Sequence, residues 1–202
     1  MIWFPYAILN FIVMVFCYLT NWFVCLFADE CGELPHIFRM WQTWDDSTDC
    51  GFLVKTVVPK FLRYDFDRHY EEYESTTPDL EKVGRKRWFV RLKDPNFTTK
   101  EKIQRYFCRV WWLTRNCSYG FAFWCFGFIV EPQNMVWIKY TDDYRLGYDK
   151  SRNILIRPWV LKSNRRINKY MIWEVFLGWK ISNEHDTPMQ CMIATRPTIR
   201  FE

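Results

Sequence analysis

The chain has 202 residues, of which 50% are apolar, and this is enough for one ordinary domain with an appendage. It contains no internal repeat and no low-complexity tract, which excludes repeat and low-complexity architectures. Aromatic residues make up 20% of the chain and favour a membrane interface, with an aromatic-rich soluble core as the alternative. The net charge of +5 suits an anionic lipid surface or nucleic acid but is too small to decide between them.

The first predicted element is a membrane-spanning helix over residues 2–28, IWFPYAILNFIVMVFCYLTNWFVCLFA. This run carries no charge and exceeds the roughly 20 residues that suffice to cross a bilayer. Aromatic side chains near both of its ends are typical of interfacial belts. A cleavable signal peptide fits less well, because the run lacks a basic start, is too long and leads into LFADECG, a poor cleavage site. The sequence therefore predicts a retained anchor.

Three carboxylates, Asp45, Asp46 and Asp49, follow in the loop WQTWDDSTDCG at residues 41–51. Oxygen ligands of this kind bind divalent cations, so a metal or catalytic loop is one interpretation. The loop is not an EF-hand, however, and it lacks the histidine partners of a hydrolytic zinc site. A turn or helix cap, in which the aspartates accept backbone N–H groups, is the favoured interpretation. We therefore expect no metal, no cofactor and no catalytic residue.

The common enzyme and metal motifs are missing from the sequence. It has no CxxC, HExxH, GxSxG, P-loop or GxGxxG pattern. The eight cysteines lack paired-motif spacing, which favours free thiols in a reducing compartment. Cys50, Cys108 and Cys191 are accordingly expected to be reduced, with the C-terminal region in the cytoplasm.

Little regular structure is predicted between this loop and the next long helix. Residues 52–68 mix apolar and basic side chains around Pro59, which predicts short helices or an irregular surface segment. Residues 71–87 are polar and rich in turn formers, which predicts a mobile connection.

A second helix is predicted from a capping box, in which Thr98 precedes Glu101 by three residues. The apolar residues that follow repeat at helical spacing: Ile103, Tyr106, Phe107, Val110 and Trp111. Basic residues occupy the other faces: Lys100, Lys102, Arg105 and Arg109. Such a helix is typical of a membrane surface, where we expect these bases, Trp111 and Trp112 to meet anionic head groups. Packing on the protein's own core is an equally good alternative.

The C-terminal part predicts a sheet. Residues 118–130, SYGFAFWCFGFIV, are uncharged but too short to span a bilayer, and fit a core, interfacial or re-entrant segment. From Met135, four stretches are rich in β-branched and aromatic residues: MVWIKYT, NILIRPWVLK, KYMIWEVFLGWKI and MQCMIATRPTIRF. Turn formers separate them at 142–143, 163–164 and 183–188. This pattern predicts an antiparallel meander of four or five strands, with Pro158 at an edge or a bulge.

These elements predict an α+β fold with an N-terminal transmembrane helix, a basic amphipathic helix and a C-terminal antiparallel β-sheet. Three regions follow: an anchor at 1–28, a mixed membrane-proximal region at 29–134 and a sheet region at 135–202.

Three stretches resemble, in order, the landmarks of an uncharacterised family of tailed-bacteriophage proteins. They are LPHIFRMWQTWDDSTDCGF, CRVWWLTRNCSYGF, and FLGWKI followed by a strand ending in TRPTIRF. The matching positions are Gln42, Thr43, Asp45 and Asp49, then Trp112, Leu113, Arg115, Asn116, Tyr119, Gly120 and Phe121, then Gly178, Trp179 and Lys180. The chain departs from the family pattern at Trp44 and Cys117, where the family tends to have proline, and at Asp46, which replaces asparagine. The resemblance implies a phage origin and a host-membrane setting, and no activity.

We therefore expect a non-enzymatic phage accessory protein, anchored in the host inner membrane with its C-terminal region in the cytoplasm. Its expected partners are a bilayer with anionic head groups and a host envelope component or another phage protein, not nucleic acid. Two alternatives remain open. One is a metal-dependent enzyme acting on lipid or nucleic acid through Asp45, Asp49 and Arg115. The other is a virion component that enters the membrane during genome delivery.

The resemblance also suggests how the acidic loop is held. Arg115 and the loop both fall in matched motifs beside apolar segments, and a guanidinium binds a carboxylate through two parallel hydrogen bonds. We predict that Arg115 pairs with Asp45 or Asp49 and docks the loop onto the corner formed with Asn116 and Tyr119.

Overall fold

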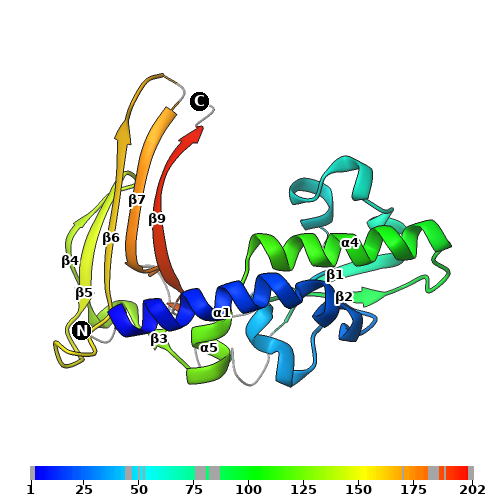
Figure 1. Ribbon diagram of the computed structural model, residues 1–202, viewed down its shortest axis with the longest axis horizontal. Helices are drawn as coiled ribbons and strands as arrows, with labels where there is room; N and C mark the ends of the chain where they lie inside the picture. Colours follow the sequence, from blue (N-terminus) through cyan, green and yellow to red (C-terminus); the bar gives the residue numbers. More distant parts are fainter. Residues whose placement is uncertain are drawn as a thin grey trace. The chain divides into compact units, whose positions relative to one another are not determined.

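The structure is a computed structural model that describes residues 3–43, 47–49, 51, 53–75, 81, 87–169, 171–181, 187–188 and 190–199. Helices and strands are mixed along the chain, so the predicted α+β class is confirmed (Figure 1). The chain divides into two compact units. Unit 1 contains residues 1–10 and 127–202, and unit 2 contains residues 11–126.

The longest helix, α1 (Trp3–Val24), begins in unit 1 and continues into unit 2. Its 22 residues correspond to a length of about 33 Å, against a hydrocarbon core of about 30 Å in a bilayer. No charged residue interrupts the helix, and many of its large side chains are exposed, as Phe4, Phe11 and Leu19 illustrate. With the next turn, η1 (Cys25–Phe27), it is long and apolar enough to cross a membrane.

Short helices, a hairpin and a long helix build the rest of unit 2. In chain order these are η2 (His36–Trp41), η3 (Leu53–Val57), η4 (Lys60–Leu62), α2 (Phe66–His69), β1 (Tyr70–Ser75), β2 (Arg87–Leu92), α4 (Thr99–Arg115) and α5 (Phe121–Phe126). The short helices between 53 and 69 agree with the prediction for that segment. The prediction of a mobile connection at 71–87 is wrong for 71–75, which pair with 87–91 as antiparallel strands. Cross-strand contacts such as the stacking of Tyr73 on Phe89 outweigh the local turn preference.

Helix α4 begins where the sequence predicts. The hydroxyl of Thr98 accepts from the Glu101 N–H at 3.2 Å, and the Glu101 carboxylate accepts from the Thr98 N–H at 2.8 Å. This capping box satisfies N–H groups that a helix start leaves without intrahelical partners. One side of α4 packs against α1 and the chain that follows it, in a core formed by Cys17, Val24, Cys25, Leu34, Trp41, Trp112, Leu113 and Cys117.

A curved antiparallel sheet dominates unit 1 (Figure 1). Its strands are β4 (Met135–Tyr140), β5 (Tyr144–Asp149), β6 (Trp159–Arg166), β7 (Met171–Trp179) and β9 (Cys191–Ile199), and each pairs with the next. The predicted meander is therefore confirmed. A short pair, β3 (Ile129–Val130) with β8 (Thr187–Pro188), and the turn η5 (Pro132–Asn134) accompany the sheet.

Several details of the predicted sheet differ. Residues 163–164 were expected in a turn but lie inside β6, because the ladder with β7 pairs both of them. Residues 144–149, which the pattern did not single out, form β5. Residues 153–156 were expected in a strand but form an exposed turn, in which the Asn153 side chain accepts from the Leu155 N–H at 3.1 Å. Pro158 precedes β6, where its missing N–H costs no ladder bond, and its carbonyl accepts from Asp149.

The first turns of α1 pack on this sheet. Trp3 Nε1 donates to the Gly178 carbonyl at 2.9 Å, and the Trp3 ring lies 5.0 Å from that of Trp159. Tyr6 packs on the buried Trp179, with 4.8 Å between their rings. Gly178 has a φ of +98°, and a Cβ there would come 2.3 Å from the Trp159 carbonyl oxygen, so glycine is required. The Gly-Trp-Lys landmark thus joins α1 to the sheet.

Candidate functional site

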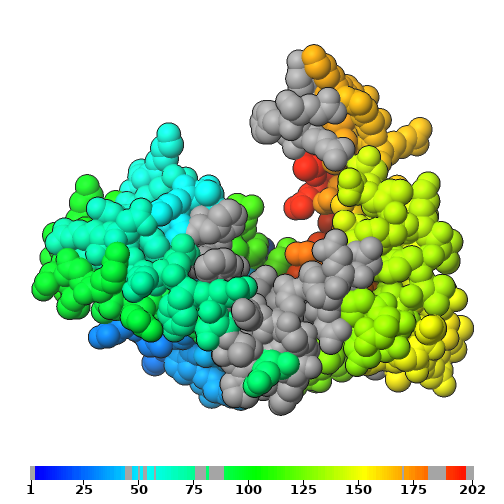
Figure 2. All heavy atoms as spheres, turned by 180° about the vertical axis from the view of Figure 1, so that it is seen from behind, coloured from blue at the N-terminus to red at the C-terminus, as the bar shows by residue number. Residues whose placement is uncertain are grey.

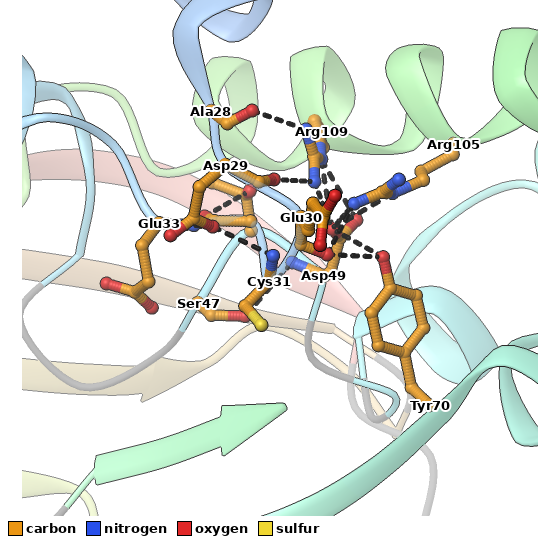
Figure 3. A network of polar contacts seen from close by, with 12 residues as sticks. Ala28, Asp29, Glu30, Cys31, Glu33, Ser47, Asp49, Tyr70, Arg105 and Arg109 are labelled. Atoms are coloured by element: carbon orange, nitrogen blue, oxygen red, sulfur yellow. Dashed lines mark hydrogen bonds and ion pairs between the residues drawn. The ribbon is translucent and has the colours of Figure 1, made fainter. Parts of the chain in front are cut away.

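A buried carboxylate lies inside unit 2 (Figure 3). Asp49 is completely buried, and the side chains of Arg105 and Arg109 reach it from α4. These arginines are four residues apart and therefore project from the same face of the helix. Tyr70, at the start of β1, approaches the carboxylate as well.

Arg109 makes the closest contact with this carboxylate. Its Nε lies 3.1 and 3.0 Å from the two oxygens of Asp49, and its Nη2 also donates to Oδ2. Arg105 adds its Nε and Nη2 at 3.2 and 3.1 Å from Oδ2. The hydroxyls of Tyr64 and Tyr70 donate at 3.4 and 3.3 Å. The charge of Asp49 is therefore fully compensated inside the protein.

The same arginines bind the backbone that follows α1. Arg109 donates to the carbonyls of Ala28 and Asp29 at 3.3 and 2.7 Å, and Arg105 donates to that of Glu30 at 2.6 Å. Carbonyl groups beyond a helix end lack intrahelical partners and carry partial negative charge, which guanidinium groups satisfy. The network thus fixes the path of the chain as it leaves α1.

Gly32 allows this exit turn to approach Asp49 closely. Its φ is +77°, and a Cβ there would lie 2.7 Å from the Asp49 nitrogen. The Thr48 hydroxyl donates to the Gly32 carbonyl at 2.6 Å, which ties the acidic loop to the turn. A larger residue at this position would separate the two segments.

The electrostatics keep the site ionised. Burial by itself would raise the pKa of Asp49, but the charges and hydrogen bonds of Arg109 and Arg105 lower that pKa below its ordinary value. Burial would likewise lower the pKa of Arg109, but Asp49 raises it. Burial and the charge of Asp49 raise the pKa values of Tyr64 and Tyr70. At neutral pH the site therefore holds one carboxylate, two guanidinium groups and two neutral hydroxyls.

This arrangement suits a structural role. A divalent cation prefers several oxygen ligands, whereas the oxygens of Asp49 already bind two guanidinium groups whose charge would repel a metal. A general base needs access to substrate and a pKa near the working pH, and the buried, acidified Asp49 offers neither. In the part of the chain that the structure describes, no cluster of His, Cys, Asp or Glu could hold a metal ion.

The prediction that Arg115 pairs with Asp49 is wrong. Arg115 is exposed at the C-terminal end of α4, whereas Asp49 is bound by Arg105 and Arg109. Arg115 lies six residues beyond Arg109, which is about 9 Å along the helix axis and on another face. Asp45 and Asp46 lie outside the described residues, so the other half of this prediction is not tested.

The corner after α4 nevertheless lies against the start of the acidic loop. Gly120 is so close to Gln42 that a Cβ would come 2.1 Å from the Gln42 carbonyl oxygen. Asn116 ends the helix, with its N–H donating to the Trp112 carbonyl at 3.0 Å, and Tyr119 occupies the following turn. The two landmarks therefore meet through the backbone near Gly120, without a contribution from Arg115.

The outer face of α4 differs from the expected membrane surface. Lys100 and Lys102 are exposed as predicted, and so is Trp111. The predictions for Arg105, Arg109 and Trp112 are wrong, because the first two bind Asp49 and the third is buried in the core. The exposed apolar residues form a stripe at four-residue spacing, with exposed fractions between 42% and 53%: Ile103, Phe107 and Trp111.

This stripe lies beside the exposed part of α1 in unit 2. The hydroxyl of Tyr106 donates to the Trp22 carbonyl at 2.6 Å, which fixes the two helices together. The neighbouring Trp22 and Phe23 on α1 and Leu26 in η1 are exposed. Soluble proteins rarely expose such contiguous apolar surface, so this surface is a candidate membrane-binding surface.

A model of the family of unknown function DUF7338 matches residues 1–200. The chain belongs to this family. Comparisons with curated proteins and with solved structures gave no match. The family supplies no activity, and the phage origin implied by the resemblance stays a prediction.

Two features of the site were missed by the sequence reasoning. The four-residue spacing of Arg105 and Arg109 is the signal for a paired arginine clamp, but the amphipathic pattern led to the prediction that both meet anionic head groups at a membrane surface. The exposure of Ile103 and Phe107 had no signal of its own, since an apolar stripe on a helix fits the core equally well.

Proposed function

We propose that the protein is a non-enzymatic accessory protein of a tailed phage, anchored in the host inner membrane by α1. Its remaining surface then binds a host envelope component or another phage protein. The phage setting is supported by the resemblance of the three sequence landmarks, which occur in the same order. The anchoring is supported by the exposed apolar side chains of α1.

The observation that carries the proposal is the apolar outer surface of α1 and α4 in unit 2. The helices α1 and α4 direct large apolar side chains outward, whereas Arg105, Arg109 and Asp49 are directed inward. In water this arrangement exposes the groups that water solvates poorly. In contact with lipid the same arrangement is favourable, since the apolar groups meet acyl chains and the exposed Lys100 and Lys102 meet anionic head groups.

The enzyme alternative has less support from the structure. It relies on Asp45, Asp49 and Arg115. Asp45 lies outside the described residues, but Asp49 is buried beneath two arginines and Arg115 is exposed elsewhere on α4. If the protein had a metal-dependent activity, and a folded Asp49→Asn variant kept that activity, the catalytic site would have to lie elsewhere in the chain. The virion alternative is distinguished by testing purified particles for the protein.

Membrane fractionation of the full-length protein tests the anchoring. We expect the protein to stay in the pellet after alkaline carbonate extraction, because a long apolar helix holds it in the lipid. An Ile12→Lys/Val15→Lys variant, changed at two exposed positions of α1, should shift to the soluble fraction. An Asp142→Lys/Asp143→Lys variant in the β4–β5 turn is the matched control and should stay in the pellet. Soluble wild-type protein would contradict the proposal.

The proposed orientation places the C-terminal region in the cytoplasm. A C-terminal tag should then resist protease in intact spheroplasts and become sensitive after lysis. Digestion of the tag in intact spheroplasts would reverse the orientation while leaving the anchoring in place. Affinity capture of the tagged protein from membranes of infected cells would identify the partner.

A further inference from the structure

An exposed apolar loop connects β5 and β6 in unit 1. We call residues 150–158, KSRNILIRP, the 150s loop. At its tip Ile154, Leu155 and Ile156 are 66%, 63% and 46% exposed. The yellow atoms of this segment form an outer corner of unit 1 in Figure 2. Three consecutive branched apolar side chains in water are unusual for a turn, whose residues are commonly polar.

The exposure is fixed by an ordered backbone. The Ile156 N–H donates to the Asn153 carbonyl at 3.0 Å, and the Leu155 N–H donates to the Asn153 side chain. At the base of the loop, the buried Asp149 accepts from the N–H and the hydroxyl of Ser151 at 2.7 and 2.6 Å. Hydrogen bonds thus hold the loop in a turn whose tip is exposed to solvent and does not pack in the core of unit 1.

Basic residues flank the tip on both sides. Lys150 is exposed, and Arg152 and Arg157 are partly exposed. Arg157 lies over the Tyr148 ring at 4.9 Å, and Arg152 is 3.7 Å from Asp149, so both guanidinium groups are held near the base. An apolar tip with a positive base matches the interface of an anionic bilayer, where acyl chains lie below negatively charged head groups.

The loop also lies next to the start of α1. Trp159, the first residue after the loop, packs against Trp3 of α1 with 5.0 Å between the rings. In the first turns of α1, Phe4 and Ile8 are exposed. Figure 1 shows the loop beside the N-terminal end of this helix. The loop and the first turns of α1 therefore both offer exposed apolar side chains in unit 1.

We propose that the 150s loop is a second membrane contact, which inserts Ile154, Leu155 and Ile156 into the interface of an anionic bilayer. The proposal rests on the proposed membrane anchoring by α1. A second copy of the chain is a poorer occupant, because a symmetric contact between two such loops would bring Lys150, Arg152 and Arg157 against their equivalents.

Photocrosslinking in full-length protein tests this contact. Benzoylphenylalanine is placed at Leu155, at Ile12 on α1 and at Ile167, and the protein is reconstituted in phosphatidylethanolamine and phosphatidylglycerol bilayers. Ile12 reports the anchor. Ile167 is the control, since it is similarly exposed but lies beyond the other end of β6, whose eight residues span about 26 Å. Unchanged melting temperatures establish that the variants fold.

We expect lipid adducts at positions 155 and 12, few at 167, and a yield at 155 that falls at least about threefold in pure phosphatidylcholine bilayers. Adducts at 12 with none at 155 overturn the loop proposal and leave the anchoring in place. A protein adduct at 155 also overturns it and indicates a protein-docking loop. Adducts at 155 without any at 12 support the loop and overturn the anchor, and no adduct at either position overturns both.

Discussion

The two long helices expose apolar side chains for different reasons. Helix α1 has no charged residue, so any face that it turns outward is apolar or uncharged. Helix α4 is amphipathic and carries basic residues along its length, yet Arg105 and Arg109 lie inside while Ile103, Phe107 and Trp111 lie partly outside. The composition of α1 therefore decides which side chains it exposes. The exposed surface of α4, in contrast, depends on a partner elsewhere in the chain.

That partner is Asp49. A buried carboxylate without a counterion costs several kcal/mol, so the packed state must bring a cation to it. Two arginines on one face of α4 supply this charge, and the rotation of the helix that brings them inward turns the apolar stripe outward. Amphipathicity thus shows that a helix has two unlike faces, but the burial of a charge can decide which face lies inside.

The largest expected effect is on the inner face of α4. Replacing Arg109 by Met should lower the free energy of unfolding by about 3–5 kcal/mol, because Asp49 stays buried and loses its closest partner. The matched control on the same helix is Arg115→Met at an exposed position, with an expected change within about 0.5 kcal/mol. Denaturant unfolding in detergent measures both. Equal losses for the two variants would contradict the assignment of Asp49 to Arg109.

The next effect concerns the attachment of α1 to the sheet. An unfavourable backbone conformation alone lowers the free energy of unfolding by about 1–3 kcal/mol. Gly178→Ala should lower it further, because the new Cβ also meets the Trp159 carbonyl. Gly127→Ala is the control: its φ is +61° but no atom lies within 4 Å of the new Cβ, so about 1–2 kcal/mol is expected. Thermal unfolding compares the two. A smaller loss for Gly178→Ala than for Gly127→Ala would contradict the close approach of Gly178 to the Trp159 carbonyl.

A pH dependence is expected at the start of α4. Hydrogen bonds from Thr98, and then from His69, lower the pKa of Glu101 to about 2 from an ordinary value of 4.5. Because this pKa is lower in the folded than in the unfolded state, the ionised carboxylate stabilises the folded state. The stabilisation is complete at pH values above the unfolded-state pKa and is lost as the pH falls from 4.5 towards 2. The melting temperature should fall less steeply over this window in Glu101→Gln than in the wild type. An identical slope would exclude the capping contribution.

The smallest effect is expected on the outer face of α4. Phe107→Ser should change the melting temperature in detergent by no more than about 2 °C, because the side chain is nearly half exposed. Leu113→Ser, on the buried face, is the contrasting variant and should cost about 2–5 kcal/mol. If Phe107→Ser were as destabilising as Leu113→Ser, the stripe would be covered by protein and not available to lipid.

Much of the secondary structure was predictable because its signals are local. The capping box of Thr98 and Glu101 marks the start of α4, and the uncharged run defines α1. The order of strands in the meander follows from short connections between neighbouring segments. Local signals failed where pairing overrode them, as for residues 163–164 in β6 and 71–75 in β1.

The candidate site was only partly predictable. The sequence led to the prediction that an arginine binds an aspartate of the acidic loop and that this pair has a structural role. The predicted arginine, however, was Arg115. Asp49 and Arg109 are 60 positions apart, and no periodicity relates positions so distant. Nor could the pattern show that NILI would leave the sheet as an exposed turn, because its β-branched residues favour a strand.

The sequence by itself determined the long apolar helix α1, the start of α4 and the antiparallel meander, because hydrogen bonding along the backbone and the period of apolar residues are properties of neighbours. Only the tertiary structure decided which face of α4 lies inside, which arginines meet Asp49, and that the tip of the 150s loop points away from its own core. These outcomes depend on compensating a buried charge and filling a core with residues from distant parts of the chain.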